Sequence, residues 1–300
     1  MQKKILLTGV NGQVGHALKT RLLEYELFAL SREQLDLSSA HDIRRVVREI
    51  KPDLIINPAA FTAVDKAETE PELAYAINAT APQTLAEEAA RLNAAFIHFS
   101  TDYVYDGTKN VPYLEQDIVN PVCVYGKSKL AGEEAIRAVG LPHLILRTSW
   151  VYGVYGKNFL KTILHQASER DSLRIVADQF GAPTSSESIA EGVVKLLNVW
   201  QPDLENKTGV YHFTNSGSTS WYGFASEIIN EYNRLAISRN WPALKVSIDN
   251  VVAITTADYP TLALRPANSR LDNTKLKKMF HVELPSWQQG LHQVMQAMAF

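Results

Sequence analysis

Cysteine is almost absent from this chain, and that narrows the chemistry available to it. The single Cys123 cannot form an internal disulfide, and it cannot supply the several thiolates of a structural zinc site. The eight histidines are scattered, without the close pairing that is typical of metal ligands. We therefore expect no metal, and a chain with one cysteine fits a reducing compartment.

The sequence also lacks a charge excess and a long apolar run. Lys and Arg number 30 against 32 for Asp and Glu, and the formal net charge of −2 does not suit a binder of nucleic acids or membrane surfaces. No apolar run reaches the length of a bilayer span, and the apolar segment 5–7 is too short for the core of a secretion signal. We expect a cytoplasmic protein with no nucleic-acid partner and no membrane contact.

What the chain does have is an alternation of short apolar runs and longer amphipathic stretches. Hydrophobic residues make up 46% and charged residues 21%, an ordinary globular composition. The β-like runs lie at 4–7, 27–30, 54–56, 96–99 and 144–146. The helical stretches lie at 13–23, 41–50, 72–92 and 128–138. This order predicts an α/β fold with a doubly wound parallel sheet that has helices on both faces.

The alternation loosens after about residue 150. Helical spacing continues at 158–169, 187–199, 224–235 and 288–298, between loops rich in Pro, Ser, Thr and Asn. The segment 210–213 is typical of a strand that returns to the first sheet. We predict a core over residues 1–152 and a smaller lobe over residues 153–300, packed on the core.

Three glycines follow the first predicted strand, in the order Thr8-Gly9-Val10-Asn11-Gly12-Gln13-Val14-Gly15. Gly9 lets the chain turn sharply, Gly12 lets backbone N–H groups approach a pyrophosphate, and Gly15 lets the helix pack close to the sheet. The helix N-terminus adds donors and a partial positive charge. At the first strand-to-helix turn this spacing predicts a Rossmann-type dinucleotide site, and a tight turn without a ligand is the alternative.

The second predicted strand ends at Ser31-Arg32-Glu33, where dinucleotide folds recognise the adenosine ribose. An arginine there suits the 2′-phosphate of NADP, whereas an acidic residue suits NAD. Arg32 together with the Ser31 hydroxyl favours NADPH, and Glu33 keeps NADH open as a second cofactor. A solvated loop charge is the alternative interpretation of Arg32.

Tyr125 and Lys129 have the spacing Y-x-x-x-K, which places them on one helix face, one turn apart. A lysine ammonium at that distance stabilises the phenolate and lowers the tyrosine pKa. Such a tyrosine can exchange a proton with a substrate oxygen while a hydride moves at carbon. Tyr105 and Lys109 share the spacing but lie in an Asp-Gly turn, so we choose the pair Tyr125 and Lys129.

A catalytic tyrosine of this type needs a hydroxyl partner on the preceding strand. Ser100 and Thr101 end the strand predicted at 96–99, and the carboxyl ends of parallel strands face the ligand crevice. Either hydroxyl can hydrogen-bond a substrate carbonyl, and a strand-end cap is the alternative. Trp150 follows the strand at 144–146 and suits packing on a sugar or base, with a core position as the equal alternative.

Together these features resemble the extended short-chain dehydrogenase/reductase superfamily over essentially the whole chain. Several longer motifs are similar to the dTDP-4-dehydrorhamnose reductase family within it. They are AVDKAE at 63–68, STDYVY at 100–105, RTSWVYG at 147–153, DQFGAPT at 178–184 and RPANSRLD at 265–272. The resemblance implies that NADPH, or NADH, delivers a hydride to C4 of dTDP-6-deoxy-L-lyxo-4-hexulose (dTDP-4-dehydro-L-rhamnose), giving dTDP-L-rhamnose.

The resemblance also implies roles for individual residues. Tyr125 donates the proton to the C4 oxygen, Lys129 tunes Tyr125 and binds the nicotinamide ribose, and Thr101 hydrogen-bonds near the reacting carbonyl. The implied cofactor contacts are Asn11, Gly12, Gln13 and Val14 at the pyrophosphate, Asp36 and Leu37 at the adenine, and Ala60, Phe61 and Thr62 along the cofactor. The implied sugar-nucleotide contacts are Thr101, Asp102 and Trp150.

One departure from the family concerns metal and assembly. Some relatives bind Mg²⁺ at a dimer interface through clustered glutamates, of which Glu187 would match one. After Asp272 the only acidic residue is Glu283, so the rest of such a cluster is missing. We therefore expect no metal there, and the homodimer that the family implies stays open.

Three other functions are compatible with parts of these motifs. A sugar-nucleotide 4,6-dehydratase needs an Asp-Glu pair after the threonine, but here Asp102 is followed by Tyr103. An epimerase uses the same tyrosine and lysine but recycles its cofactor. A non-catalytic regulatory subunit resembling the β subunit of methionine adenosyltransferase would bind NADP without turnover. Tyr125, Lys129 and Thr101 are all present, which favours the reductase.

Overall fold

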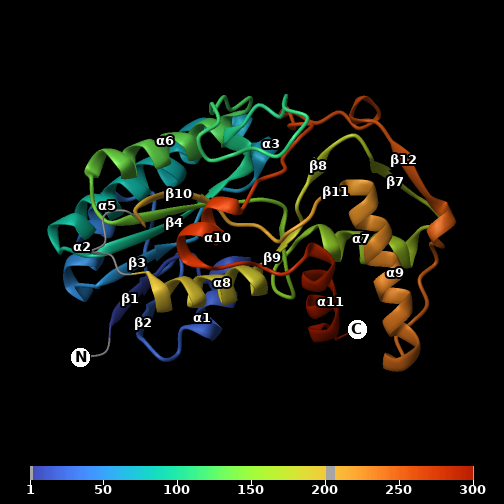
Figure 1. The fold of residues 1–300 in the computed structure, drawn as a ribbon, viewed down its shortest axis with the longest axis horizontal. Helices are drawn as coiled ribbons and strands as arrows, with labels where there is room; N and C mark the ends of the chain where they lie inside the picture. The colour runs from blue at the N-terminus through green and yellow to red at the C-terminus, as the bar shows by residue number, and fades with distance from the viewer. Residues whose placement is uncertain (1–2, 201–206, 300) are drawn as a thin grey trace.

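The structure is a computed structural model that describes residues 3–200 and 207–299. Its main sheet has six parallel strands in the order β10-β5-β4-β3-β1-β2 (Figure 1). The strands are β1 (Lys4–Leu7), β2 (Glu26–Ala29), β3 (Leu54–Asn57), β4 (Ala95–Thr101), β5 (His143–Thr148) and β10 (Gly209–His212). The α/β fold with a doubly wound parallel sheet is therefore confirmed.

Helices cover both faces of this sheet. One face carries α1 (Gln13–Arg21), α8 (Ser186–Val199) and α10 (Thr274–Phe280). The other carries α2 (Ala40–Ile50), α5 (Ala81–Arg91) and α6 (Val124–Val139). Side chains alternate between the two faces along each strand, so Ile5 and Leu7 join the first cluster and Leu6 joins the second. Both clusters are buried, as expected for strands covered on both sides.

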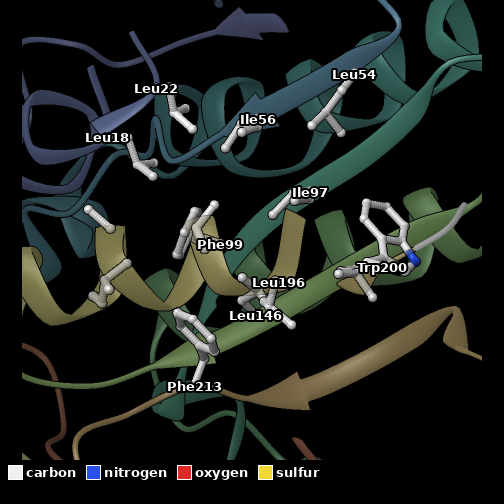
Figure 2. Close-up of a cluster of buried hydrophobic side chains, with 14 of the residues drawn as sticks. Leu18, Leu22, Leu54, Ile56, Ile97, Phe99, Leu146, Leu196, Trp200 and Phe213 are labelled. Atoms are coloured by element: carbon white, nitrogen blue, oxygen red, sulfur yellow. The ribbon is translucent and has the colours of Figure 1, made fainter. Parts of the chain in front are cut away.

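Residues after 153 contribute directly to the first cluster. Figure 2 shows Leu196 and Trp200, at the end of α8, beside Leu146 of β5 and Phe213, which follows β10. All four side chains are at most 4% exposed. The returning strand β10 thus closes one edge of the sheet and brings the second half of the chain onto the core.

The remaining elements form a second layer with its own core. Helices α7 (Phe159–Glu169), α9 (Trp221–Arg239) and α11 (Trp287–Ala297) pack with the parallel pair β7 (Leu173–Val176) and β12 (Val251–Ile254). Two short pairs connect this layer to the sheet: β6 (Val151–Tyr152) with β9 (Thr184–Ser185), and β8 (Phe180–Gly181) with β11 (Thr219–Ser220). Short 3₁₀ turns lie at Asp102–Val104 (η2), Ile248–Asn250 (η4) and Thr256–Asp258 (η5).

The single helix predicted at 72–92 is wrong. The chain forms α3 (Val64–Thr69), α4 (Pro71–Tyr75), a π-helical turn η1 (Ala76–Thr80) and then α5. The Asn78 amide accepts from Phe61 N at 2.8 Å and donates to Phe61 O at 3.1 Å and to Ser128 Oγ at 3.0 Å. These long-range bonds hold the wide turn against the neighbouring loop and α6. Among the described residues, no helix combines the length and hydropathy needed to span a bilayer.

Candidate active site

A cavity of about 280 Å³ lies where the carboxyl ends of β1, β2 and β3 meet. Among the residues that line it are seven of the expected cofactor contacts: Gly9, Arg32, Asp36, Leu37, Ala60, Phe61 and Thr62. The other expected contacts follow along the glycine-rich turn. Asn11 and Gly12 are exposed, Gln13 and Val14 are half-buried, and Gly15 is buried under the turn.

The turn itself depends on two of its glycines. Gly9 has φ of +60°, and a Cβ there would lie 2.8 Å from Ala59 Cα. A Cβ on Gly15 would lie 2.1 Å from Gly9 O, so only glycine allows α1 to pack this closely on the turn. Gly12 is the N-cap of α1 and provides no side-chain cap, which leaves the first N–H groups of the helix free for an anion such as a phosphate.

The Gln13 side chain does not turn toward the cavity. Its Nε2 donates to Val151 O at 3.3 Å, and its Oε1 accepts from Asn158 Nδ2 at 3.0 Å. Gln13 therefore links the pyrophosphate turn to the second layer. Its backbone remains the part that is available to a cofactor.

At the adenosine end of the cavity, the charges are organised around Asp36. Its carboxylate accepts from Ser38 N at 2.9 Å and from Ser38 Oγ at 2.7 Å. These bonds, helped by the charge of Arg32, lower the pKa of Asp36. The Ser31 hydroxyl donates to Glu33 at 3.1 Å, so it is already engaged, while the Arg32 side chain is exposed at the cavity wall.

Tyr125 lies in the first turn of α6. The helix begins at Val124, earlier than expected, because Cys123 acts as its N-cap and accepts from Gly126 N at 3.5 Å. The Tyr125 hydroxyl lies close to the Thr101 side chain, and burial raises the pKa of Tyr125. We expected a lowered pKa, and that expectation is wrong for this structure because desolvation of the buried phenolate dominates.

Lys129 lies one turn further along α6 and is 1% exposed. Its Nζ donates to Phe99 O at 2.6 Å and lies 3.1 Å from His98 Nε2. Burial lowers the pKa of Lys129 to about 7, against the opposing charge of Glu133. A lysine in this state can change its charge near neutral pH.

Of the two hydroxyls at the end of β4, only Thr101 is near Tyr125. The Ser100 hydroxyl donates to Glu133 at 2.5 Å, and Glu133 forms a buried ion pair with Arg147, also at 2.5 Å. Thr101 Oγ1 donates to Asp102 Oδ1 at 2.9 Å and accepts from Tyr103 N at 3.2 Å. Ser100 therefore belongs to a structural network, and Thr101 is the hydroxyl of the site.

Asp102 carries a buried acceptor that nothing in the described chain uses. Its Oδ2 has no hydrogen-bond partner, while Oδ1 accepts from Thr101 Oγ1. Burial raises the pKa of Asp102 to about 6. A buried acceptor without a partner is costly, so this oxygen suits a ligand hydroxyl.

Trp150 adopts a left-handed backbone with φ of +49°. Its ring stacks on Trp221 with centroids 3.5 Å apart and an interplanar angle of 7°. A Cβ on Gly181 would lie 2.5 Å from Trp150 Cε2, so the ring edge is packed closely against β8. Trp150 is half-buried and belongs to an aromatic pair at the junction of the two layers.

The sequence did not single out two residues of this region, Tyr103 and Arg265, as site residues. The Tyr103 ring contacts Tyr125 edge-on, with centroids 5.5 Å apart. The Arg265 guanidinium lies 5.9 Å from the centre of the Tyr103 ring and pairs with Asp65 at 2.5 Å. Arg265 opens the motif at 265–272, so its motif was visible in the sequence, but its proximity to Tyr103, 162 positions away, was not.

The alternative pair, Tyr105 and Lys109, has a structural role. The buried Tyr105 hydroxyl contacts Leu114 O at 2.9 Å and Arg147 at 2.7 Å. Lys109 forms an ion pair with Asp117 at 2.5 Å. Both residues are therefore engaged in contacts of the loop that follows β4.

Comparisons with known proteins agree with this geometry. Residues 3–300 match the family described as RmlD substrate binding domain. A dTDP-4-dehydrorhamnose reductase of Aggregatibacter actinomycetemcomitans is 44% identical over 97% of this chain and 98% of its own length. The enzyme of the same name from Escherichia coli K12 is 42% identical over 97% of this chain and 96% of its own length.

A solved structure gives the same result. The dTDP-4-dehydrorhamnose reductase of Bacillus anthracis, in complex with NADP, has a TM-score of 0.90 and 34% identity, and covers 99% of this chain and 100% of its own. A dTDP-glucose 4,6-dehydratase of Streptomyces venezuelae, 17% identical with a TM-score of 0.77, shares the fold. On this evidence, the chain belongs to the RmlD substrate binding domain family.

Proposed function

We propose that this chain reduces the C4 ketone of dTDP-6-deoxy-L-lyxo-4-hexulose with NADPH and gives dTDP-L-rhamnose. It is an oxidoreductase of the NAD(P)H-dependent type, with NADH as a second usable cofactor. The observation that carries the proposal is the contact between the hydroxyls of Tyr125 and Thr101, with Lys129 one helical turn away. The activity named for the relatives and the NADP bound in the Bacillus anthracis structure support it.

The residues present fit a dinucleotide. The cavity after β1, β2 and β3 accepts its adenosine half, and the uncapped N-terminus of α1 suits its pyrophosphate. When bound, the reduced nicotinamide supplies the hydride. Arg32 is the side chain that would hold a 2′-phosphate, and Asp36 and Leu37 would contact the adenine.

Tyr125 supplies the proton in this proposal. Its raised pKa keeps the hydroxyl protonated at neutral pH, which suits a group that must donate to the oxygen formed at C4. Thr101 would hydrogen-bond the oxygen of the substrate carbonyl beside Tyr125 by turning its hydrogen away from Asp102 Oδ1. Lys129 uses one N–H on Phe99 O and is also bonded to His98 Nε2, which leaves one N–H for a hydroxyl of a ribose.

The sugar nucleotide would occupy the space in front of Asp102 and Trp150. The unpartnered Asp102 Oδ2 accepts from a sugar hydroxyl. Arg265, which is 18% exposed in its side chain, offers a cation for the diphosphate after exchanging part of its pairing with Asp65. Trp150, stacked on Trp221, forms an apolar wall at the junction of the layers.

We further propose that the core predicted over residues 1–152 binds the dinucleotide, and that the lobe over residues 153–300 binds the sugar nucleotide together with Asp102 and Trp150 of the core. A cytoplasmic location and independence from nucleic acids belong to the same proposal. Assembly as a homodimer is the state that the resemblance implies, and sedimentation of the purified protein tests it.

Cofactor oxidation tests the proposed function. The protein is mixed with NADPH or NADH and the 4-keto sugar nucleotide, and the absorbance of the reduced cofactor is followed while the product is identified by mass. Stoichiometric oxidation with dTDP-L-rhamnose as product is the expected result. Conversion without net oxidation would favour an epimerase, and NADPH binding without oxidation would favour a regulatory subunit.

A further inference from the structure

Behind Lys129 lies a row of three buried polar side chains, His98, Asn57 and Thr8, that the proposed chemistry does not use. Lys129 Nζ lies 3.1 Å from His98 Nε2, and His98 Nδ1 lies 3.2 Å from Asn57 Nδ2. Thr8 Oγ1 is 2.6 Å from Asn57 Oδ1. All four side chains are at most 1% exposed. The chain runs from the residue before Gly9, across β3 and β4, to α6.

The direction of each hydrogen bond among these four side chains follows from the number of hydrogens that each group carries. Thr8 donates to Asn57 Oδ1, which turns the amide N–H toward His98 Nδ1. Burial lowers the pKa of His98 well below its usual value, so the ring is neutral and has one N–H. With Nδ1 accepting, the proton is on Nε2 and faces Lys129 Nζ. This arrangement requires Lys129 to be an uncharged amine.

The same heavy atoms can also form these hydrogen bonds with every donor and acceptor exchanged. A charged Lys129 donates to His98 Nε2, the ring proton moves to Nδ1, and Nδ1–H donates to the Asn57 oxygen after the amide rotates by half a turn. The Asn57 N–H groups then donate to Thr8 Oγ1. The charged form has one more proton than the uncharged form, and that proton comes from solvent. Each nitrogen and oxygen of the row keeps a hydrogen-bond partner in both directions, and only the hydrogen of Thr8 loses its acceptor, Asn57 Oδ1, in the reversed direction.

We propose that His98 is a positioning residue for Lys129, and that the chain Thr8–Asn57–His98–Lys129 reverses its hydrogen-bond direction when Lys129 gains or loses a proton. This inference rests on the proposed function, in which Lys129 binds the cofactor ribose and tunes Tyr125. The other charged groups nearby are Glu133 of α6 and its ion-pair partner Arg147 of β5, and Tyr125 is the remaining titratable group on this face of α6.

Nitrogen NMR of the histidine rings tests the reversal directly. In the cofactor-free protein, labelled with ¹⁵N-histidine, we expect the His98 proton to move from Nδ1 to Nε2 as the pH rises, with a midpoint near 7 and without a charged ring at any pH. Lys129→Met should abolish the transition. The control is His143, whose Nδ1 lies 2.9 Å from Leu141 O and whose tautomer should not change. A single His98 tautomer from pH 5.5 to 9.5, or a charged ring, overturns the proposed reversal.

Activity tests the positioning role. His98→Leu removes both ring nitrogens, and we expect kcat to fall about ten-fold, with the KM for the sugar nucleotide little changed and a displaced pH profile. His98→Gln, which keeps a polar group near Nζ, should recover most of the loss. His143→Gln, at a second buried histidine of the sheet, should leave kcat and its pH profile unchanged.

The two levels of the inference fail separately. If the wild type does not oxidise NADPH with the keto sugar, the proposed function fails, whereas the NMR result on the cofactor-free protein still decides the reversal. If the wild type turns over and His98→Leu matches it in kcat and pH profile, only the role of His98 fails. If His98→Leu does not fold, Thr8→Val provides a second test, because it removes the hydroxyl at the far end of the hydrogen-bonded row. It should displace the midpoint of the His98 transition in the NMR titration. An unchanged midpoint overturns the proposal that the four side chains act together.

Discussion

Thr101 Oγ1 donates its only hydrogen to Asp102 Oδ1, 2.9 Å away. Because Thr101 has no second hydrogen to donate, it can act only as an acceptor toward the neighbouring Tyr125 hydroxyl, which would direct the Tyr125 hydrogen toward the end of β4. A carbonyl oxygen placed between the two residues meets an O–H donor whose proton is not shared with any carboxylate. This orientation suits the reducing direction of the reaction, in which Tyr125 gives up a proton.

The ionisation of Asp102 should reduce stability. Because its pKa is raised to about 6 in the fold from 3.8, the folded state binds more protons between these values, and its stability falls as the pH rises through that window. Asp102→Asn removes this cost. We expect the variant to unfold at higher urea than the wild type at pH 7.5, by about 3 kcal/mol, and the difference to become small near pH 4.

Asp249→Asn, at an exposed carboxylate, is the matched control and should behave as the wild type at both pH values. An Asp102→Asn variant that is no more stable than the wild type at pH 7.5 would show that ionised Asp102 is well accommodated. The KM for the sugar nucleotide should rise in the same variant, because an amide lacks one of the two carboxylate acceptors.

Cofactor preference should depend on Arg32 and Glu33. Arg32→Ala should raise the KM for NADPH roughly ten-fold and leave the KM for NADH nearly unchanged, since only NADPH has the 2′-phosphate. Glu33→Gln should lower the KM for NADPH, because it removes a negative charge near the 2′-phosphate. Steady-state kinetics with both cofactors measure this, and Arg91→Ala on α5 is the control. Equal losses with both cofactors in Arg32→Ala would exclude a phosphate-specific role.

Two glycines of the first turn should respond differently to alanine. Gly15→Ala places a Cβ 2.1 Å from Gly9 O, and we expect it to destabilise the fold by about 1–3 kcal/mol, measured by urea unfolding. Gly12→Ala places its Cβ 3.2 Å from the same oxygen, so the protein should fold. Its NADPH Kd should rise roughly ten-fold because the methyl group faces the pyrophosphate. If Gly12→Ala folds and binds NADPH with wild-type affinity, the pyrophosphate does not bind at this turn.

The sequence was sufficient for the fold class and the family, and both predictions are confirmed. Buried parallel strands are continuously apolar, so β1, β3 and β4 stand out without any tertiary information. The helix expected at 72–92 is wrong because α- and π-helical turns have the same local propensities. The bonds from Asn78 to Phe61 and Ser128, which stabilise the wide turn, join residues 17 and 50 positions apart.

The electrostatics of the site were less predictable than its residues. Spacing alone indicated that Tyr125 and Lys129 share a helix face, and it suggested a lowered tyrosine pKa. The pKa of Tyr125 is instead raised, because its environment is set by how deeply α6 packs against the loop after β4. His98 is 31 positions from Lys129, and no local pattern marks it as a partner.

The most direct test compares Tyr125→Phe with the wild type in the oxidation of NADPH by dTDP-6-deoxy-L-lyxo-4-hexulose, with Tyr75→Phe, at a tyrosine that is 39% exposed, as control. The variant lacks only the hydroxyl that carries the transferred proton, so kcat should fall roughly 10²–10⁴-fold while the NADPH Kd measured by fluorescence stays the same. Tyr75→Phe should match the wild type. A Tyr125→Phe enzyme with wild-type kcat would contradict the assignment of Tyr125 as the proton donor.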